Sequence, residues 1–194
     1  MSELFPTGAD NRGLSIHRGV GPGTLLVSTP GINSDYFQQT VILITERNST
    51  GHLGFVLNKQ TIAEVRTALV QHGMEWPYQD FMYEGGPVQR SAMIMMHSQD
   101  WYSSNTMQVS DICAISSDKL MFEKMIDFNM PAQRKFLFGQ CVWTQGQLDR
   151  EISHHRSWLT LPATEQLVWD TEGEDQWHAA IELCAKSAID HYFE

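Results

Sequence analysis

The chain has 194 residues, 42% of them hydrophobic and 19% charged, and a formal net charge of −10. Its size and composition suit one globular domain and exclude a disordered or fibrous chain. The charge disfavours direct nucleic-acid binding, since residues 160–194 hold eight acidic residues against the single Lys186 and no basic stripe offsets them. No apolar run reaches the roughly 20 residues that cross a bilayer, and the start has no signal-peptide pattern, so we expect a cytoplasmic protein without membrane contact.

Short strands dominate the prediction for the first part of the chain. Residues 1–22 are rich in glycine and predict an irregular arm with little to bury. Apolar, β-rich runs predict strands at residues 24–28, 40–46 and 53–58. The polar segment 47–52 joins the last two strands and predicts a hairpin.

A helix is predicted after the hairpin. Thr61 and Glu64 have the T-x-x-E spacing of a capping box, in which each side chain satisfies a backbone group at the helix start. Gly73 supplies a left-handed stop. The predicted helix therefore spans about three turns.

A strand at residues 81–83 runs into the turn Glu84-Gly85-Gly86-Pro87. Gly85 and Gly86 leave two backbone amides free of side-chain cover. This pattern predicts either a tight turn at a sheet edge or a backbone contact for an anion.

The remaining segments alternate between strands and helices. Strands are expected at residues 92–96, 106–109, 112–115 and 136–143, and short strands or extended packing segments at residues 158–160 and 166–169. Helices are expected from Ser116 or Ser117 to Phe128, and at residues 147–155 and 174–189. The first of these helices is expected to turn four residues inward, namely Leu120, Met121, Met125 and Phe128. Strand 136–143 is the most continuously apolar, so we place it centrally in the sheet.

Strands occur in pairs as well as in alternation with helices, which predicts an α+β fold. We expect a single domain over residues 23–194, built around a large mixed β-sheet with about four flanking helices.

Five segments, taken in order, resemble the motifs of one family. They are Gly23-Thr24-Leu25-Leu26-Val27-Ser28-Thr29-Pro30, Asp35-Tyr36-Phe37, Gly51-His52-Leu53-Gly54-Phe55-Val56-Leu57-Asn58-Lys59, Gly85-Gly86-Pro87-Val88 and Trp143-Thr144-Gln145-Gly146-Gln147-Leu148-Asp149-Arg150-Glu151-Ile152. Together they look like the YqgE/AlgH family of bacterial proteins. The resemblance implies a cytosolic protein with an α+β fold around a large mixed sheet. The family has no established activity, and its link to transcriptional regulation comes through the AlgH name.

The chain departs from the family pattern mainly around one turn and its helix. Gln140-Cys141-Val142 stands where members have an aromatic residue and a small pair, and Asp149 replaces a glutamate. His154-His155-Arg156 lengthens the next segment by one residue, and Gln60 replaces a proline. The resemblance alone therefore carries no ligand over to this chain.

A candidate binding site follows from the glycine turns. We expect Asn58, the Gly85-Gly86 turn and the Gly146-Gln147 helix start to form a groove that holds a small molecule or a partner protein segment. Four tryptophans of the last third either pack the core or line such a groove: Trp143, Trp158, Trp169 and Trp177.

No catalytic, metal or cofactor signature is present in the sequence. The eight histidines include no H-x-x-x-H spacing, and there is no phosphate-binding loop or nucleophile elbow, so no cofactor or metal is expected. The cysteines lie far apart in apolar segments, which predicts reduced, packed thiols at Cys113, Cys141 and Cys184. Two hypotheses remain. The favoured one is a non-enzymatic binding or regulatory protein, because no acid–base–nucleophile spacing occurs. The alternative is a small hydrolase or transferase that uses Cys141 or His97.

Overall fold

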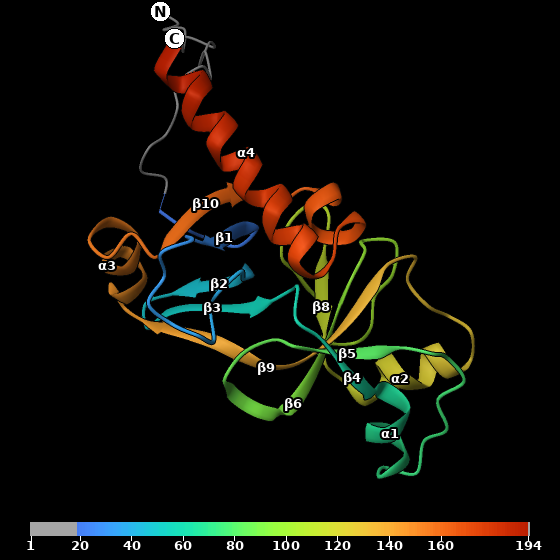
Figure 1. The fold of residues 1–194 in the computed structure, drawn as a ribbon. Coiled ribbons are helices and arrows are strands. Elements are labelled where there is room, and N and C mark those ends of the chain that lie inside the picture. The colour runs from blue at the N-terminus through green and yellow to red at the C-terminus, as the bar shows by residue number, and fades with distance from the viewer. Residues whose placement is uncertain (1–18, 194) are drawn as a thin grey trace, which may run out of the picture.

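The computed structural model describes residues 19–193, with side chains placed up to residue 190. Within this range ten strands form one sheet, and five helices accompany it (Figure 1). This architecture confirms the predicted α+β fold around a large sheet. Most of the arm expected at residues 1–22 lies outside the described residues. In the described range, no helix has both the length and the apolar content needed to cross a membrane.

The strands are β1 (Thr24–Ser28), β2 (Val41–Asn48), β3 (Gly51–Val56), β4 (Gln60–Glu64), β5 (Phe81–Glu84), β6 (Val88–His97), β7 (Met107–Gln108), β8 (Ala114–Ser116), β9 (Arg134–Thr144) and β10 (Trp158–Pro162). The helices are α1 (Val65–Val70), α2 (Lys119–Ile126), α3 (Gln147–Ser153), the π-helix η1 (Gln166–Asp170) and α4 (Gly173–Phe193). The main strand order is β10-β1-β2-β3-β9-β6-β8-β7, and β4 joins through β5, which pairs with β9. The β5–β9 pair is parallel and the other described pairs are antiparallel, so the sheet is mixed.

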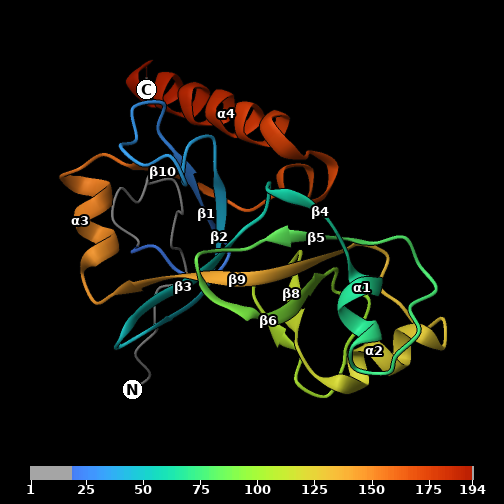
Figure 2. The same cartoon turned by 60° about the horizontal axis from the view of Figure 1, so that its bottom comes forward.

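Strand β9 is central, as its apolar sequence predicts. Its second half pairs with β3, and its first half pairs with β5 and β6. Gly139 separates the halves with a φ of +71°, and a Cβ there would lie 2.1 Å from the Gly86 carbonyl oxygen. A larger residue would therefore suffer both backbone strain and a clash. Figure 2 shows β9 running from α3 at one end toward α2 at the other.

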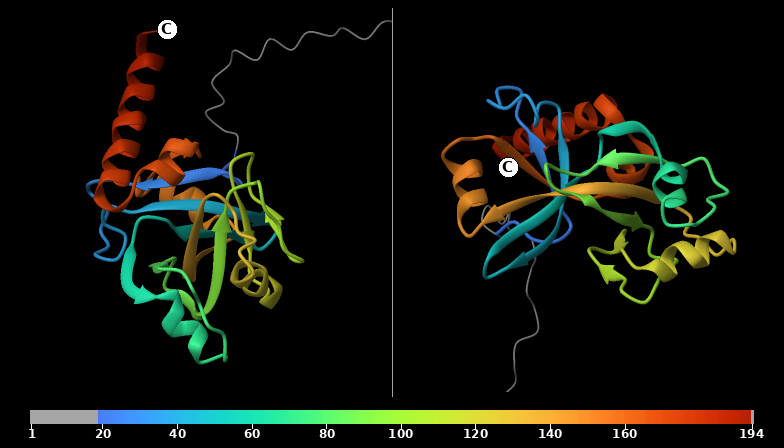
Figure 3. Two further views of the ribbon diagram at one scale, coloured as in Figure 1. Left: turned by 90° about the vertical axis from the view of Figure 1, so that its right-hand side faces the viewer. Right: turned by 90° about the horizontal axis from the view of Figure 1, so that it is seen from below.

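Three buried clusters form the core. Neighbouring residues along a strand point to opposite faces of the sheet, so Leu25 and Leu26 enter different clusters. The cluster with Leu25 packs against η1 and α4, and the cluster with Leu26 packs beneath α3. A third cluster fills the space between the sheet, α1 and α2. The C-terminal part of α4 extends beyond the sheet (Figure 3).

The helix predicted from Thr61 to Gly73 is wrong in its first turn. Residues 60–64 form strand β4, and α1 begins at Val65. The Thr61 hydroxyl donates to the Met82 carbonyl oxygen on β5 (2.8 Å) and does not cap a helix, and Glu64 provides no side-chain cap either. Pairing with β5 satisfies this backbone through tertiary contacts, which override the local capping pattern.

Two further predictions need correction. The segment at residues 166–169 is the π-helix η1 and not a strand, because a short buried apolar run does not distinguish the two. Helix α2 is capped by Asp118, whose Oδ1 accepts from the Met121 amide (2.7 Å), and it ends at Ile126. Its buried residues are Met121, Phe122 and Met125. Leu120 and Phe128, predicted to face inward, are 40% and 75% exposed.

Candidate functional site

Two residues, Gln145 and Gly146, separate the end of β9 from the start of helix α3. Gly146 turns the chain with a φ of +71°, a left-handed conformation that favours glycine. The Gln147 side-chain oxygen accepts hydrogen bonds from the Thr144 amide (3.1 Å) and hydroxyl (3.2 Å). The strand and the helix are therefore joined by side-chain bonds as well as by the turn.

Glu151 gathers three elements around one carboxylate. It lies four residues after Gln147, on the same face of α3. Its Oε2 accepts from the indole nitrogens of Trp143 on β9 (3.0 Å) and Trp158 on β10 (2.8 Å). Its Oε1 accepts from the Gln147 side-chain nitrogen (2.9 Å). We call these four residues the Glu151 network.

A pocket of about 460 Å³ opens beside the Glu151 network. Its lining combines aromatic, charged and neutral polar residues: Ile32, Asn33, Ser34, Phe37, Gln147, Arg150, Glu151, His155, Ser157 and Trp158. The rings of Phe37 and Trp158 meet edge to face with their centroids 5.4 Å apart. Three lining residues are apolar and seven are polar or charged, so the cavity is more polar than a typical small-molecule site. We call this cavity the α3 pocket.

A second polar group lies around Tyr36, the residue before Phe37. The Lys59 ammonium donates to the Tyr36 carbonyl oxygen and lies 4.2 Å from the centroid of its ring. Burial lowers the pKa of Lys59, although the Glu84 carboxylate opposes this shift. Burial, and then Glu84, raise the pKa of Tyr36. Glu84 itself pairs with Arg90 (2.9 Å).

The side chain of Asn58 forms hydrogen bonds with three backbone groups. Its Oδ1 accepts from the Val41 amide (3.0 Å), and its Nδ2 donates to the carbonyl oxygens of Gln39 (2.7 Å) and Gly173 (2.9 Å). The side chain is 7% exposed. It therefore ties the loop after β1 and the start of α4 to the end of β3.

Gly85 and Gly86 form a close turn against β9. The Gly85 oxygen accepts from the Val56 amide (2.8 Å), and its amide donates to the Phe138 oxygen (2.8 Å). A Cβ on Gly86 would lie 2.1 Å from the Gln140 carbonyl carbon. These glycines allow two backbone segments to approach each other.

The predicted site residues thus fall into two groups linked by the Tyr36-Phe37 turn. Gln147 lines the α3 pocket, and Gly146 stands at the start of its helix. Asn58 precedes Lys59 and Gly85 follows Glu84, and the Glu84 amide donates to the Lys59 carbonyl oxygen (2.8 Å). This second group meets Tyr36 through Lys59. The Tyr36 and Phe37 rings are in contact, with their centroids 4.8 Å apart.

The two residues considered for catalysis are packed in the core. Cys141 is 2% exposed, and burial raises the pKa of its thiol to about 12. A protonated, buried thiol is a poor nucleophile. His97 is fully buried, with its ring nitrogens 2.8 Å from the Ser98 oxygen and 3.0 Å from the Ser116 hydroxyl, and burial lowers its pKa.

Sequence reasoning missed the roles of Phe37, Arg150, Glu151 and His155. The spacing of Gln147 and Glu151 on one helix face, between two tryptophans, is a signal that could have identified the network. Phe37 comes from a distant loop, and nothing local marks its approach to Trp158.

The AlgH-like family matches residues 25–188 of this chain. A UPF0301 protein of Proteus mirabilis is 30% identical over 167 residues, which cover 81% of this chain and 88% of that protein. A UPF0301 protein of Desulfotalea psychrophila is 32% identical over 164 residues, covering 81% and 84%. The solution structure of the AlgH protein from Pseudomonas aeruginosa superposes with a TM-score of 0.70 at 25% identity, covering 81% of this chain and 85% of that chain. The crystal structure of the protein DIP2367 from Corynebacterium diphtheriae has a TM-score of 0.67 at 21% identity, with 83% and 85% covered, and shows the shared fold.

Proposed function

This chain belongs to the AlgH-like family, and from the geometry of the α3 pocket we propose that it is a non-enzymatic binding protein with a regulatory role. The names of the relatives state no activity, so the proposal rests on the site. The ligand is a small molecule, or a side chain of a partner protein, that enters the α3 pocket.

The observation that carries this proposal is the fixed wall of the pocket. Three hydrogen bonds hold Glu151 between Trp143, Trp158 and Gln147. Trp158 is 3% exposed and Phe37 packs against it, so the aromatic wall is ordered before any ligand arrives. A preorganised wall lowers the entropy cost of binding.

The surroundings support binding over catalysis. The pocket offers a carboxylate whose two oxygens already accept three hydrogen bonds. The hydroxyls of Ser34 and Ser157 also line it, but among the described residues neither is hydrogen-bonded to His155 or to the Glu151 carboxylate. Cys141 and His97, the candidate reactive residues, are buried elsewhere in the core. Covalent catalysis requires a nucleophile and a base within hydrogen-bond reach.

A thermal-shift screen over nucleotides, amino acids and organic acids tests the proposal. A ligand present at 100 times its Kd stabilises the protein by about 2.7 kcal/mol, which raises Tm by about 5 °C or more. We expect at least one compound to do so without being consumed, as judged by chromatography of the incubated mixture.

Ser157→Phe is the matching pocket variant, because Ser157 lines the cavity and its side chain would then fill it. Ser187→Phe places the same bulk on an exposed position of α4 and serves as the control. We expect a compound that raises the Tm of the wild-type protein to leave the Tm of Ser157→Phe unchanged and to raise the Tm of Ser187→Phe. Conversion of this compound to product, or equal binding by both variants, would refute the proposal.

A further inference from the structure

Building on the proposed function, we infer that the ligand of the α3 pocket is a small organic anion. Its carboxylate or phosphate group is held by Arg150 and His155. Its apolar part lies against Phe37 and Trp158.

Arg150 and His155 supply the guanidinium and imidazole groups of the pocket, beside the neutral polar side chains of Asn33, Ser34 and Ser157. Both line the cavity and are exposed. Among residues 19–193, neither side chain makes a hydrogen bond or an ion pair. The neighbouring His154 differs, since its Nδ1 lies 2.7 Å from the Ser153 hydroxyl. A guanidinium with free donors is well suited to carboxylate or phosphate, which it binds through two parallel hydrogen bonds.

The position of Arg150 is set by the turn before α3. A Cβ added to Gly146 would meet the Arg150 Nη1 at 3.4 Å, so the guanidinium folds back over the helix start. The guanidinium thus packs against the turn at Gly146, at a distance of ordinary van der Waals contact from the position of the added Cβ.

Glu151 does not favour a cation in the same pocket. Its oxygens accept from two indoles and one amide, which uses three of the roughly four acceptor positions of a carboxylate. A cationic ligand would find little acceptor capacity there and would meet Arg150. An anion meets unused donors instead, and three neutral donors stabilise the charge that Glu151 keeps.

The apolar part of the pocket wall indicates which group the anion carries. Phe37 and Trp158 meet edge to face, and Ile32 extends the surface. Aromatic side chains of this kind contribute buried area with little loss of conformational freedom. An anion that carries an aromatic or aliphatic group therefore fits better than an inorganic ion.

Four probes of similar size test the inference: benzoate, phenyl phosphate, benzylamine and benzyl alcohol. Each is titrated into the full chain while the indole N–H signals of Trp143 and Trp158 are followed by NMR. We expect benzoate or phenyl phosphate to bind about tenfold more tightly than benzylamine and benzyl alcohol, as one charge-assisted contact implies. The order of the two anions separates a carboxylate ligand from a phosphate ligand.

Arg150→Gln should raise the Kd of the more tightly bound anion, benzoate or phenyl phosphate, about tenfold. Arg156→Gln makes the same charge change at an exposed position outside the α3 pocket and should alter the Kd less than twofold. Both residues are exposed, so folding is retained. An equal loss of anion affinity in the two variants would show that only the net charge of the protein matters, which would overturn the inference.

The outcomes also separate this inference from the proposed function. Benzylamine or benzyl alcohol binding as tightly as the anions would overturn the anion preference while leaving a ligand pocket in place. If no probe moves either indole signal, the inference is refuted, and the screen with Ser157→Phe decides the proposed function independently.

Discussion

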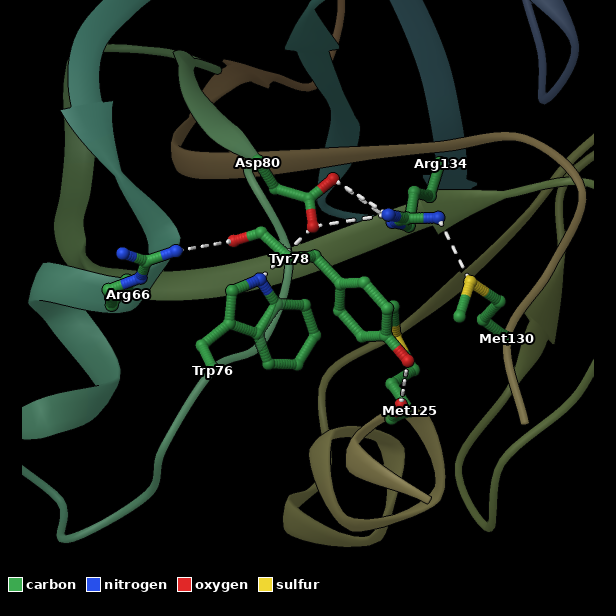
Figure 4. A network of polar contacts seen from close by, with 7 residues as sticks. All are labelled: Arg66, Trp76, Tyr78, Asp80, Met125, Met130 and Arg134. Carbon is green, nitrogen blue, oxygen red and sulfur yellow. Dashed lines mark hydrogen bonds and ion pairs between the residues drawn. The ribbon is translucent and has the colours of Figure 1, made fainter. Parts of the chain in front are cut away.

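Two carboxylates near opposite ends of β9 organise their surroundings in different ways. Near the start of the strand, Asp80 accepts from Arg134 Nε (3.1 Å) and Nη2 (3.2 Å) and from the Trp76 indole (3.0 Å) (Figure 4). The Arg134 guanidinium also lies over the ring of Tyr78, whose hydroxyl donates to the Met125 oxygen (2.7 Å). We call this group the Asp80 network. Its charges are paired, and the two ionic side chains are 19% and 16% exposed.

Near the other end of β9, Glu151 is held by neutral donors alone. Its hydrogen bonds fix two tryptophans but leave the adjacent Arg150 unpaired among the described residues. The α3 pocket opens beside Glu151. Two half-buried carboxylates that both accept from tryptophan indoles therefore have different roles. Pairing with a guanidinium completes the Asp80 network as a structural unit, whereas the Glu151 network supports a surface with free donors.

The largest effect is expected from Arg134→Met. This change leaves Asp80 largely buried with a single hydrogen bond from Trp76. Breaking a buried pair on one side costs several kcal/mol, so the free energy of unfolding should fall by about 3 kcal/mol in urea denaturation. Arg66→Met is the control, since its guanidinium is exposed and makes one long contact to the Tyr78 oxygen (3.5 Å). A loss below about 1 kcal/mol in Arg134→Met would show that the Asp80 network is not a structural unit.

A smaller decrease in the free energy of unfolding is expected from Glu151→Gln. Three donors point at the carboxylate, and the glutamine side chain replaces one oxygen with another donor. At least one donor then loses its acceptor, which should lower the free energy of unfolding by about 2 kcal/mol. Asp149→Asn, an exposed change on the same helix, should cost less than about 0.5 kcal/mol. Equal unfolding curves for the two variants would contradict a role for Glu151 in ordering the pocket wall.

A third test concerns the turn that positions Arg150. Gly146→Ala forces a side chain into the left-handed region and should cost about 1 kcal/mol. Gly73 has the same φ of +71° and no atom within 4 Å of its would-be Cβ, so Gly73→Ala carries the backbone cost alone. We expect similar unfolding curves for both variants and weaker benzoate binding for Gly146→Ala alone. Unchanged benzoate binding by Gly146→Ala would show that the turn does not position Arg150.

The fold was more predictable than the site, for physical reasons. The long apolar run of β9 identified a central strand, because burial on both faces leaves a continuous signal in sequence. The switch from β4 to α1 escaped prediction, since pairing of Thr61 with Met82 is a tertiary contact. The same limit applies to the α3 pocket. Gln147 could be named from its turn, whereas Phe37 reaches Trp158 across more than half of the chain.

The smallest change in the free energy of unfolding is expected at a third carboxylate, Glu172. This residue is exposed, whereas its partner Lys135 is buried. Lys135 on β9 is 4% exposed, and its ammonium lies 3.6 Å from Glu172 and 4.6 Å from the centroid of the Tyr83 ring. It makes no hydrogen bond within the described chain. Replacing such a buried charge with an apolar residue is often neutral or stabilising, so Lys135→Met should raise the free energy of unfolding by about 0.5 kcal/mol near pH 7.

The sign of the pH dependence tests that explanation. Burial lowers the pKa of Lys135 in the folded state, so the unfolded chain binds this proton more tightly. Wild-type stability therefore gains from this group as pH rises from the lowered pKa toward the unfolded value of about 10.4. Lys135→Met lacks that gain, and its advantage should shrink as the pH rises toward the unfolded pKa of about 10.4 in paired urea titrations. A variant less stable than the wild type at every pH would mean that the lysine stabilises the strand as a charged partner of Glu172, as Arg134 does with Asp80. An advantage that stays constant would contradict the lowered pKa of Lys135.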